Sequence, residues 1–358
     1  MATVVPCLFA DVMATLVERE QGAAQILPGN LTAEWAQQPS SVALVRKLNL
    51  IQTGAFAFCG ESGPIEKTLN DIRLFLPDLL SDPRPAGRIG AAVDWRNKNE
   101  YGRAAHQVVG CVADEAGELN FVGPEGSGFD EGAFGHCIGI GTGAPELQKY
   151  CEVLSEQVHS FPPLHRAFLL FATINAHRLS EEMLHETREV ESWGGYVEWA
   201  YQIRETRPAW RRGPSTLHLF LVISKKDDGS PGLQFVHKFV AYDAETGRIL
   251  AFTRGLKQSA KAEFVLRDML SEKSGLSGNE VFWRTWRPEA CVTTVIGRDK
   301  SGKRSTFLNT IWAPGTKVSH DDVTFSWTEE HGFKFGHSEG LRSRIDGPAL
   351  EALGPLHP

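Results

Sequence analysis

Short apolar segments recur along the chain and are separated by stretches rich in Gly, Pro or polar residues. The first, residues 4–17, is apolar except at Asp11 and Thr15. Two further segments, residues 43–52 and 54–60, meet at a turn. Runs of this length bounded by turn residues are typical of buried strands. We therefore predict three strands here, with residues 21–41 forming a loop because they are rich in Gly, Pro, Gln and Ser.

The rest of the first half alternates helical and strand patterns. Pro64 opens a stretch with apolar residues at helical spacing (Ile65, Leu69, Ile72), which predicts an amphipathic helix over 64–76. Residues 88–105 show no period that assigns them an element. The elements predicted after them are a hairpin at 106–123, a strand at 136–142, a helix carrying Leu147, Tyr150, Cys151 and Leu154, a helix at 164–186, and a strand at 194–203.

The pattern changes at a short polar segment rich in Arg and Pro, residues 205–214. Beyond it the chain is mostly strand-like, with one predicted helix at 260–271. Strands and helices run in separate groups and do not alternate as βαβ units, so the pattern predicts an α+β fold. We predict two domains, residues 1–203 and a β-rich domain at 204–358. The predicted strands of the second domain lie at 217–224, 233–243, 248–254, 281–286, 291–297, 305–312 and 323–327.

Composition and charge narrow the possible functions. A formal net charge of −7 over 358 residues gives no basic surface for nucleic acid or an anionic membrane. No apolar run approaches the ~20 residues that span a bilayer, and the N-terminal residues lack signal-peptide features. The six cysteines are scattered without a C-x-x-C pair, which disfavours a zinc or dithiol site. We expect a cytoplasmic protein with reduced cysteines and with no metal or cofactor.

Five segments occur in a defined order within residues 1–203. The first ends in Asp-Val-Met-Ala-Thr, the second begins with a Lys and ends in a Gly-rich turn into a helix, and the fifth contains a Gly-Gly strand. Together they resemble the proteasome β-subunit and bacterial proteasome-like peptidase family. The segments are VVPCLFADVMAT, KLNLIQTGAFAFCGESGPIEKTLNDI, CVADEAGELNFVGPEG, HCIGIGTGAPELQKY and SWGGYVEWAYQI.

The resemblance implies an N-terminal-nucleophile (Ntn) hydrolase fold, an αββα sandwich of two antiparallel sheets between helices. In that family a free N-terminal Thr is the nucleophile, a Lys and an Asp support it, and a Gly turn holds the oxyanion. By resemblance, Asp11 corresponds to the Asp, Lys47 to the Lys (with Arg46 as an alternative) and Gly60 to the oxyanion-hole glycine. Thr3 is the candidate nucleophile.

The chain departs from this family at the nucleophile. Asp11 lies eight residues after Thr3, about 26 Å away if extended at ~3.3 Å per residue, which leaves no room for the family's first hairpin. Removal of Met1 would expose Ala2 instead of Thr3. At the closing Ser-Gly-Gly motif, Trp193 takes the place of the Ser.

Several residues keep two interpretations. Asp11 and Lys47 form either a residual site or a structural salt bridge. Cys59 and Ser62 flank the Gly turn, where a relocated nucleophile would lie, but we favour a core position for Cys59 and a helix cap for Ser62.

Three further groups are expected to be structural, although each has a functional alternative. The first group could hold a metal ion on one helix face, but we favour a solvated face; its residues are His177, Glu181 and His185. The second could form an aromatic binding surface, but we favour core packing; its residues are Trp283, Arg284, Trp286, Arg287, Trp312 and Trp327. The third could be a histidine-rich metal site, but we favour loop residues; its residues are His320, Asp321, Asp322, His331 and His337.

These observations favour a proteasome-related, non-catalytic or strongly diverged protein that acts as an assembling scaffold or binding module. Its partner would be a second copy of the chain or another protein, possibly a peptide, and the helix at 64–76 is the predicted contact surface. The alternative is an active threonine-type peptidase or amidase that uses Thr3 after trimming.

Overall fold

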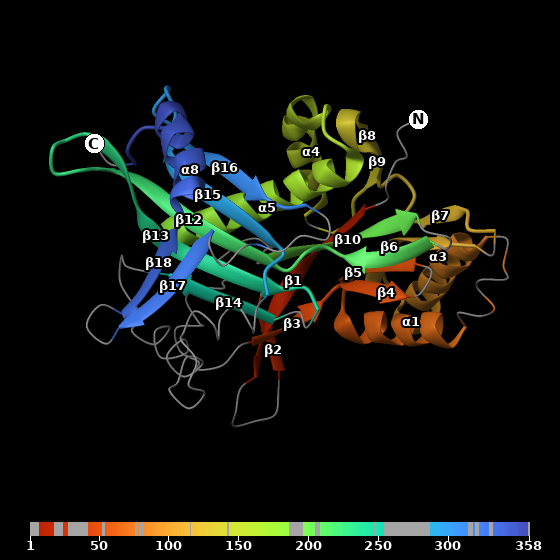
Figure 1. Cartoon of the computed structure of the whole chain (residues 1–358). Helices are drawn as coiled ribbons and strands as arrows, with labels where there is room; N and C mark the ends of the chain where they lie inside the picture. The colour runs from red at the N-terminus through yellow and green to blue at the C-terminus, as the bar shows by residue number, and fades with distance from the viewer. Residues whose placement is uncertain are drawn as a thin grey trace. The chain divides into compact units, whose positions relative to one another are not determined.

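The computed structural model describes most of the chain, and Figure 1 shows its course. Helices and strands are both abundant and are mostly grouped separately, which confirms the α+β class. The described residues are 7–17, 24–27, 42–51, 54–75, 78, 82, 84–114, 116–141, 143–185, 196–204, 208–245, 248–253, 287–313, 318, 322–328 and 332–356.

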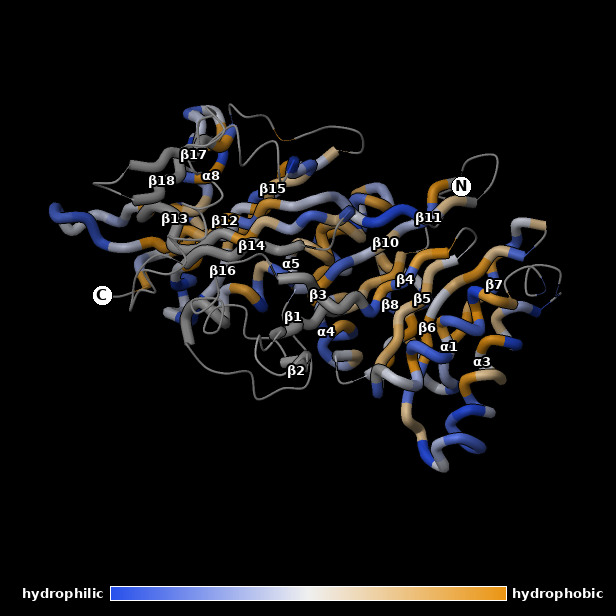
Figure 2. Tube along the Cα trace, turned by 90° about the horizontal axis from the view of Figure 1, so that it is seen from below, coloured by the Kyte–Doolittle hydropathy of each residue, from blue (hydrophilic) through white to orange (hydrophobic). Residues whose placement is uncertain are grey.

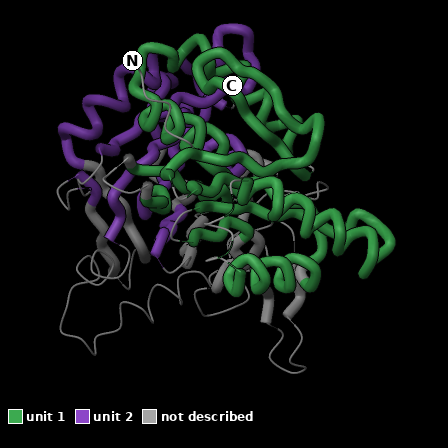
Figure 3. The backbone as a smooth tube through the Cα atoms, turned by 90° about the vertical axis from the view of Figure 1, so that its right-hand side faces the viewer, with its two compact units in different colours: residues 1–13, 45–174, 190–213 green, residues 14–44, 175–189, 214–358 purple. Residues whose placement is uncertain are grey.

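The chain divides into two compact units, which Figure 3 shows in different colours. Unit 1 contains residues 1–13, 45–174 and 190–213, and unit 2 contains residues 14–44, 175–189 and 214–358. Each unit is therefore assembled from three separate segments. The division into two domains at residue 203 stays a prediction. The two compact units instead alternate along the sequence.

The described residues of unit 1 form two sheets, a small hairpin and the α-helices α1, α3, α4 and α5. β4, β5, β6 and β7 form an antiparallel four-stranded sheet, and β10 pairs antiparallel with both β1 and β11. The strands are β1 (Cys7–Val17), β4 (Leu48–Ile51), β5 (Gly54–Gly60), β6 (His106–Ala113), β7 (Leu119–Val122), β8 (Gly128–Glu131), β9 (Gly135–Ile138), β10 (Tyr196–Arg204) and β11 (Pro208–Arg212). The helices are α1 (Ser62–Leu74), α3 (Pro85–Arg96), η2 (Asn97–Tyr101), η3 (Gly132–Phe134), α4 (Ala144–Val158) and α5 (Pro163–His185). The helix α5 and the strand β1 continue into unit 2.

Three hydrophobic clusters set the order of the layers in unit 1. The first joins α1 and α3 to β5 and β6 through residues such as Ile72, Ile89 and Phe58. The second joins α4 and α5 to β10 through Leu154, Leu170, Val197 and their neighbours. Figure 2 shows the hydrophobic residues running along β5 and β6. Each sheet is therefore covered by helices on one face.

The third cluster lies between the two sheets. Ala10 of β1 and Ala200 of β10 come from one sheet, and Leu48, Ala57 and Val109 come from the other. Because successive side chains of a strand point to opposite faces, each sheet buries one face under helices and the other against its partner sheet. The layers of unit 1 are helices, sheet, sheet and helices.

Unit 2 is centred on β12, which pairs antiparallel with β13 and parallel with β15. α8 covers one face of this sheet, where Leu341, Ile345 and Ala349 contact Leu219 and Leu221 of β12 and their neighbours. The elements are β2 (Ala24–Leu27), β3 (Val42–Arg46), β12 (Thr216–Lys225), β13 (Pro231–Asp243), β14 (Arg248–Thr253), β15 (Ala290–Arg298), β16 (Arg304–Ile311), β17 (Val323–Thr328), β18 (Gly332–His337) and α8 (Glu339–Ala352).

Some elements differ from the sequence-based prediction. Residues 85–101 form α3 and the π-helical η2, and residues 339–352 form α8; neither helix was predicted. Gly and Pro residues within these helices weaken the helical signal, and tertiary packing compensates for them. Four short strands were also missed: β2 within the predicted loop 21–41, β8, β11 within the polar segment 205–214, and β18, so the prediction that His337 lies in a loop was wrong. The predicted elements at 260–271 and 281–286 lie outside the described residues.

His218 links the stability of unit 2 to pH. It lies on β12, fully buried, and burial lowers its pKa from 6.5 to about 3. Between these values the unfolded chain binds a proton that the folded chain does not. The free energy of unfolding therefore falls as the pH is lowered from 6.5 towards 3, by up to about 1.4 kcal/mol per pH unit.

We expect His218→Gln to remove this part of the pH dependence, which amounts to about 2 kcal/mol between pH 7 and pH 5. Urea denaturation at the two pH values measures it. His159→Gln, at an exposed position on α4, is the matched control and should retain the wild-type dependence. Equal pH dependence in the wild type and His218→Gln would contradict the prediction.

Candidate functional site

Of the described residues implied by the resemblance, Asp11 lies within a strand, Lys47 at a strand junction and Gly60 at a strand end. Asp11 lies in β1, and its backbone pairs with Val197 of β10. The side chain of Val197 packs in the cluster under α4 and α5, whereas Ala10, which precedes Asp11 in β1, packs between the two sheets. Thr3 lies outside the described residues.

Lys47 occupies the single residue between β3 and β4 and is half-buried. The side-chain amide of Asn49 donates to the Lys47 carbonyl at 3.1 Å, which helps to hold this junction. Leu48, the next residue, is fully buried between the two sheets. The alternative, Arg46, is the last residue of β3.

Gly60 ends β5 in a backbone conformation that requires glycine. Its φ is +116°, and a Cβ there would lie 2.3 Å from the carbonyl oxygen of Ala105 and 2.6 Å from Cα of His106. The next residue, Glu61, donates its backbone N–H to the same Ala105 carbonyl at 2.9 Å. Gly60 is therefore needed for a close approach of β5 to β6, whether or not an anion ever binds there.

The segment after β9 lies beside this turn, which the sequence did not indicate. A Cβ on Gly141, which has a φ of +74°, would lie 3.2 Å from Cβ of Cys59. The Cys59 thiol donates to the side-chain carbonyl of Gln107 at 3.4 Å. Cys59 is half-buried in the strand, and α1 begins at Ser62 with Glu61 in the N-cap position, so the prediction that Ser62 is the cap was wrong.

A buried ion pair connects the two sheets and was missed by sequence reasoning. Glu198 on β10 is 1% exposed, and its carboxylate accepts a hydrogen bond from Arg212 on β11 at 2.9 Å. The same guanidinium donates to the carbonyl of Leu48 on β4 at 3.1 Å. A carboxylate this deeply buried needs such a partner to remain ionised. In the sequence, the only indication of this pair was that Glu198 is a charged residue within an apolar strand.

A second buried network resembles a catalytic constellation in its connectivity. The hydroxyl of Thr68 on α1 lies 2.8 Å from Nε2 of His106, and Nδ1 of His106 lies 3.0 Å from Oδ1 of Asn97. Oδ1 of Asn97 also accepts the backbone N–H groups of Ala105 and His106. The ring Nδ1 is therefore the donor, and Nε2 accepts from the Thr68 hydroxyl.

This arrangement gives the hydroxyl a base and the base an orienting amide, which is the geometry of an activated nucleophile. However, Thr68 is 2% and His106 1% exposed, so no substrate carbonyl reaches the hydroxyl. Burial lowers the pKa of His106, and the positive charge of Arg96 lowers this pKa further, so the ring is favoured in its neutral form. Thr68 and His106 therefore hold α1 and the start of β6 together.

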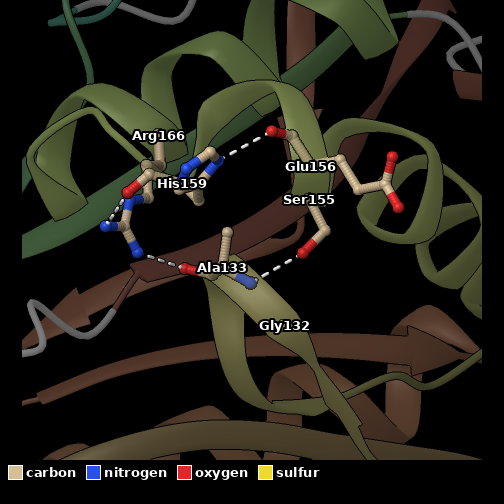
Figure 4. Close-up of a pocket in the computed structure, with 6 residues that line it drawn as sticks. All are labelled: Gly132, Ala133, Ser155, Glu156, His159 and Arg166. Carbon is tan, nitrogen blue, oxygen red and sulfur yellow. Dashed lines mark hydrogen bonds between the residues drawn. The ribbon is translucent and has the colours of Figure 1, made fainter.

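The described part of the chain also contains an open pocket of about 460 Å³ between η3 and the turn from α4 to α5 (Figure 4). Arg166 donates to the carbonyls of Ala133 at 2.7 Å and His159 at 2.5 Å. Ser155 accepts the backbone N–H of Ala133 at 2.7 Å. The pocket is lined by Gly132, Ala133, Ser155, Glu156, His159 and Arg166.

The chemistry of this pocket is limited because its polar groups already have structural partners. Nδ1 of His159 donates to the carbonyl of Glu156 at 2.8 Å, and no hydrogen bond joins the His159 ring to Ser155 among the bonds drawn in Figure 4. The carboxylate of Glu156 points away from the other lining residues in the same view. Arg166 therefore ties the α4–α5 turn to η3, and the pocket has no nucleophile and base in contact.

The remaining sequence candidates are placed as follows. His177, Glu181 and His185 all lie on α5, and within the described residues no group of three or more His, Cys, Asp or Glu side chains is arranged to hold a metal ion. Trp312 is buried, as expected for a packing residue. Asp322 lies 3.7 Å from a guanidinium nitrogen of Arg344. Trp327 and His337 lie in β17 and β18, Arg287 is exposed, and residues 283, 284, 286, 320, 321 and 331 lie outside the described part.

No protein-family model matches this chain, and no curated protein matches it in sequence. Among the described helices, none has the length and apolar character needed to cross a membrane. Any assignment of function therefore rests on the residues of the chain and their geometry.

The Gly60 turn provides a direct test of this geometry. We expect Gly60→Ala to lower the free energy of unfolding by roughly 2 to 4 kcal/mol, because a Cβ collides with backbone atoms and the positive φ is strained. Gly63→Ala is the matched control, since no atom lies within 4 Å of its Cβ position in α1, and it should change stability by less than about 1 kcal/mol. Denaturant titration of both variants measures the difference, and equal stabilities would contradict the expectation.

Proposed function

We propose that unit 1 is a proteasome-related Ntn-hydrolase-like αββα sandwich that has lost N-terminal-nucleophile catalysis. The chain would act as an assembling scaffold or binding module, with unit 2 supplying specific partner contacts. The observation that carries the proposal is the order of the layers in unit 1, in which two antiparallel sheets face each other and each is covered by a pair of helices.

The order of the elements along the chain supports the same relationship. β4 and β5 are followed by α1 and α3, then by β6 to β9, then by α4 and α5, and finally by β10 and β11. The five segments of the family resemblance imply a strand pair leading into a helix, a hairpin, a strand leading into a helix, and a closing strand, in this same order. Gly60, which corresponds by resemblance to the oxyanion-hole glycine, ends the strand whose Cys59 lies beside Gly141.

The course of β1 supports the loss of catalysis. β1 pairs continuously with β10 from Cys7 to Val12 without a reversal. Cys7 to Asp11 and Cys7 back to Thr3 are both four steps, at most about 14 Å each. Reversing the chain direction uses about two residues, so chain length leaves the backbone of Thr3 about 7 Å short of the backbone of Asp11.

Assembly is supported by large apolar side chains exposed on the helices that cover the β4–β7 sheet. The predicted apolar stripe on α1 packs inward, where Ile72 is buried in the core of unit 1, so this stripe is not available for the contact surface proposed on the helix at 64–76. Instead, Leu74 and Phe75 at the end of α1 are 73% and 56% exposed, and Trp95 on α3 is 58% exposed. Such residues are typical of surfaces that bind another protein.

The catalytic alternative is tested at the N-terminus. Intact-mass spectrometry of the purified chain should give a species beginning at Met1 or Ala2, and an epoxyketone probe for N-terminal threonine should add no mass. The physical reason is the chain length between Thr3 and Asp11, which keeps their backbones apart and so disfavours activation of the Thr3 hydroxyl by that carboxylate. A chain that begins at Thr3 and reacts with the probe would establish the threonine-type hydrolase and overturn the proposal.

Self-assembly is tested by sedimentation of the wild type and of Leu74→Ser, Phe75→Ser and Trp95→Ser. We expect the wild type to form an oligomer whose dissociation constant rises at least about tenfold in these variants, because each removes exposed apolar area from the contact. Phe121→Ser is the matched control, since Phe121 is 60% exposed on the edge strand β7 and its side chain lies on the face of the sheet opposite to Val122, which packs against α3. A monomeric wild type at micromolar concentration, or equal weakening by the control, counts against assembly through these helices.

A further inference from the structure

The strand β16 ends its sheet in unit 2. It pairs antiparallel with β15, from Arg304 opposite Arg298 to Ile311 opposite Cys291, in a one-to-one register without a shift (Figure 1). Residues 305–311 are half-buried. Among the described strands, none pairs with the other edge of β16. This edge therefore presents backbone N–H and C=O groups that the sheet itself does not use.

The bonds at the start of β16 show which residues turn these groups towards the open edge. Arg298 exchanges both of its backbone bonds with Gly354, at 2.9 and 2.7 Å, so its N–H and C=O point away from β16. The next residue, Asp299, donates its N–H to the carbonyl of Lys303 at 2.8 Å. Because the pairs of an antiparallel ladder alternate, Arg298 and Arg304 form a non-hydrogen-bonded pair. Every second residue of β16 therefore directs its N–H and C=O to the open edge, namely Arg304, Thr306, Leu308 and Thr310.

The features that normally stop an edge strand from pairing are missing from β16. Edge strands are usually short or bulged, or they carry proline or charged residues. The strand β11, which ends a sheet in unit 1, has five residues, begins at Pro208 and ends in Arg211 and Arg212. In contrast, β16 has eight residues with no proline and no bulge, and Arg304 at its start is its only charged residue. This edge is suited to accept another strand.

We propose that β16 pairs antiparallel with β16 of a second copy of the chain, about a twofold axis at Phe307. This register places Thr306 opposite Leu308 of the other copy, and both residues direct their N–H and C=O groups to the open edge. The basic start of each strand then lies opposite the uncharged end of the other, so no like charges are opposed. Such a pairing uses the same surface on both copies and closes at a dimer.

This contact goes beyond the proposed function and does not rest on it. The strand β16 belongs to unit 2, whereas the assembly surface proposed on α1 and α3 belongs to unit 1. The dimer names a second copy of the chain as a partner of unit 2. Because the two surfaces share no residue, variants can remove either one and leave the other in place.

Substitution of Thr306 separates backbone pairing from side-chain contact. Thr306→Pro removes an N–H that points to the open edge and leaves the bonds to β15 in place, whereas the matched control Thr306→Val keeps this N–H and the shape of the side chain. We expect a dimer of the full chain at micromolar concentration. The proline variant should raise its dissociation constant at least about thirtyfold, because each copy loses one hydrogen-bond donor, and the valine variant should leave it nearly unchanged.

Sedimentation is measured in the combined variant Leu74→Ser, Phe75→Ser and Trp95→Ser, which removes the apolar contact proposed on the helices of unit 1. A dimer that persists in this background and is lost on adding Thr306→Pro supports pairing through β16. A monomer in this background, or a dimer that Thr306→Pro leaves unchanged, would overturn it. An effect of the three serine substitutions on larger oligomers bears only on the proposed function, so the two failures are distinguishable.

Amide hydrogen exchange of the wild-type chain tests the register without any substitution. The N–H groups of residues 306, 308 and 310 should exchange at least about tenfold more slowly in the dimer than after dilution to the monomer. Those of residues 305, 307 and 309 point to β15 and should be protected at both concentrations. Exchange at 306, 308 and 310 that is fast at every concentration would contradict the pairing.

Discussion

The contact between the two sheets of unit 1 is the constraint on which the rest of that unit depends. Small side chains, Ala10 and Ala200 on one sheet and Ala57 on the other, allow the sheets to approach closely. Arg212 spans this contact from the Glu198 carboxylate to the Leu48 carbonyl. Because the Glu198 carboxylate is removed from water, it depends on the partly buried Arg212 guanidinium, and the pair fixes how β11 and β10 meet β4.

The glycine turn and the buried polar network extend this constraint to α1. Gly60 lets β5 approach the start of β6, and the Thr68–His106–Asn97 network holds the same point from the helix side. Hydroxyl, imidazole and amide are arranged here as in a catalytic site, but burial excludes a substrate. The network therefore stabilises the fold.

Sequence reasoning succeeded where hydrophobic periodicity is strong. The strands over 54–60 and 216–225 and the helix over 163–185 were predicted within two residues, because long apolar runs leave few alternatives. It failed where tertiary packing outweighs local preference. α8 contains Gly347 and Pro348, which weaken the helical pattern. The short strands β8 and β11 are polar and pair with other strands, so their own residues do not show the apolar pattern that predicts a strand.

The sequence alone determined the α+β class and the glycine turn at Gly60, because apolar spacing and glycine content are local properties. It also contained the eight-residue spacing from Thr3 to Asp11, which limits how close these residues can come. Only the tertiary structure decided which distant residues meet: Glu198 with Arg212 and Leu48, and Thr68 with His106. These pairings depend on strand register and helix packing, and a single sequence records neither.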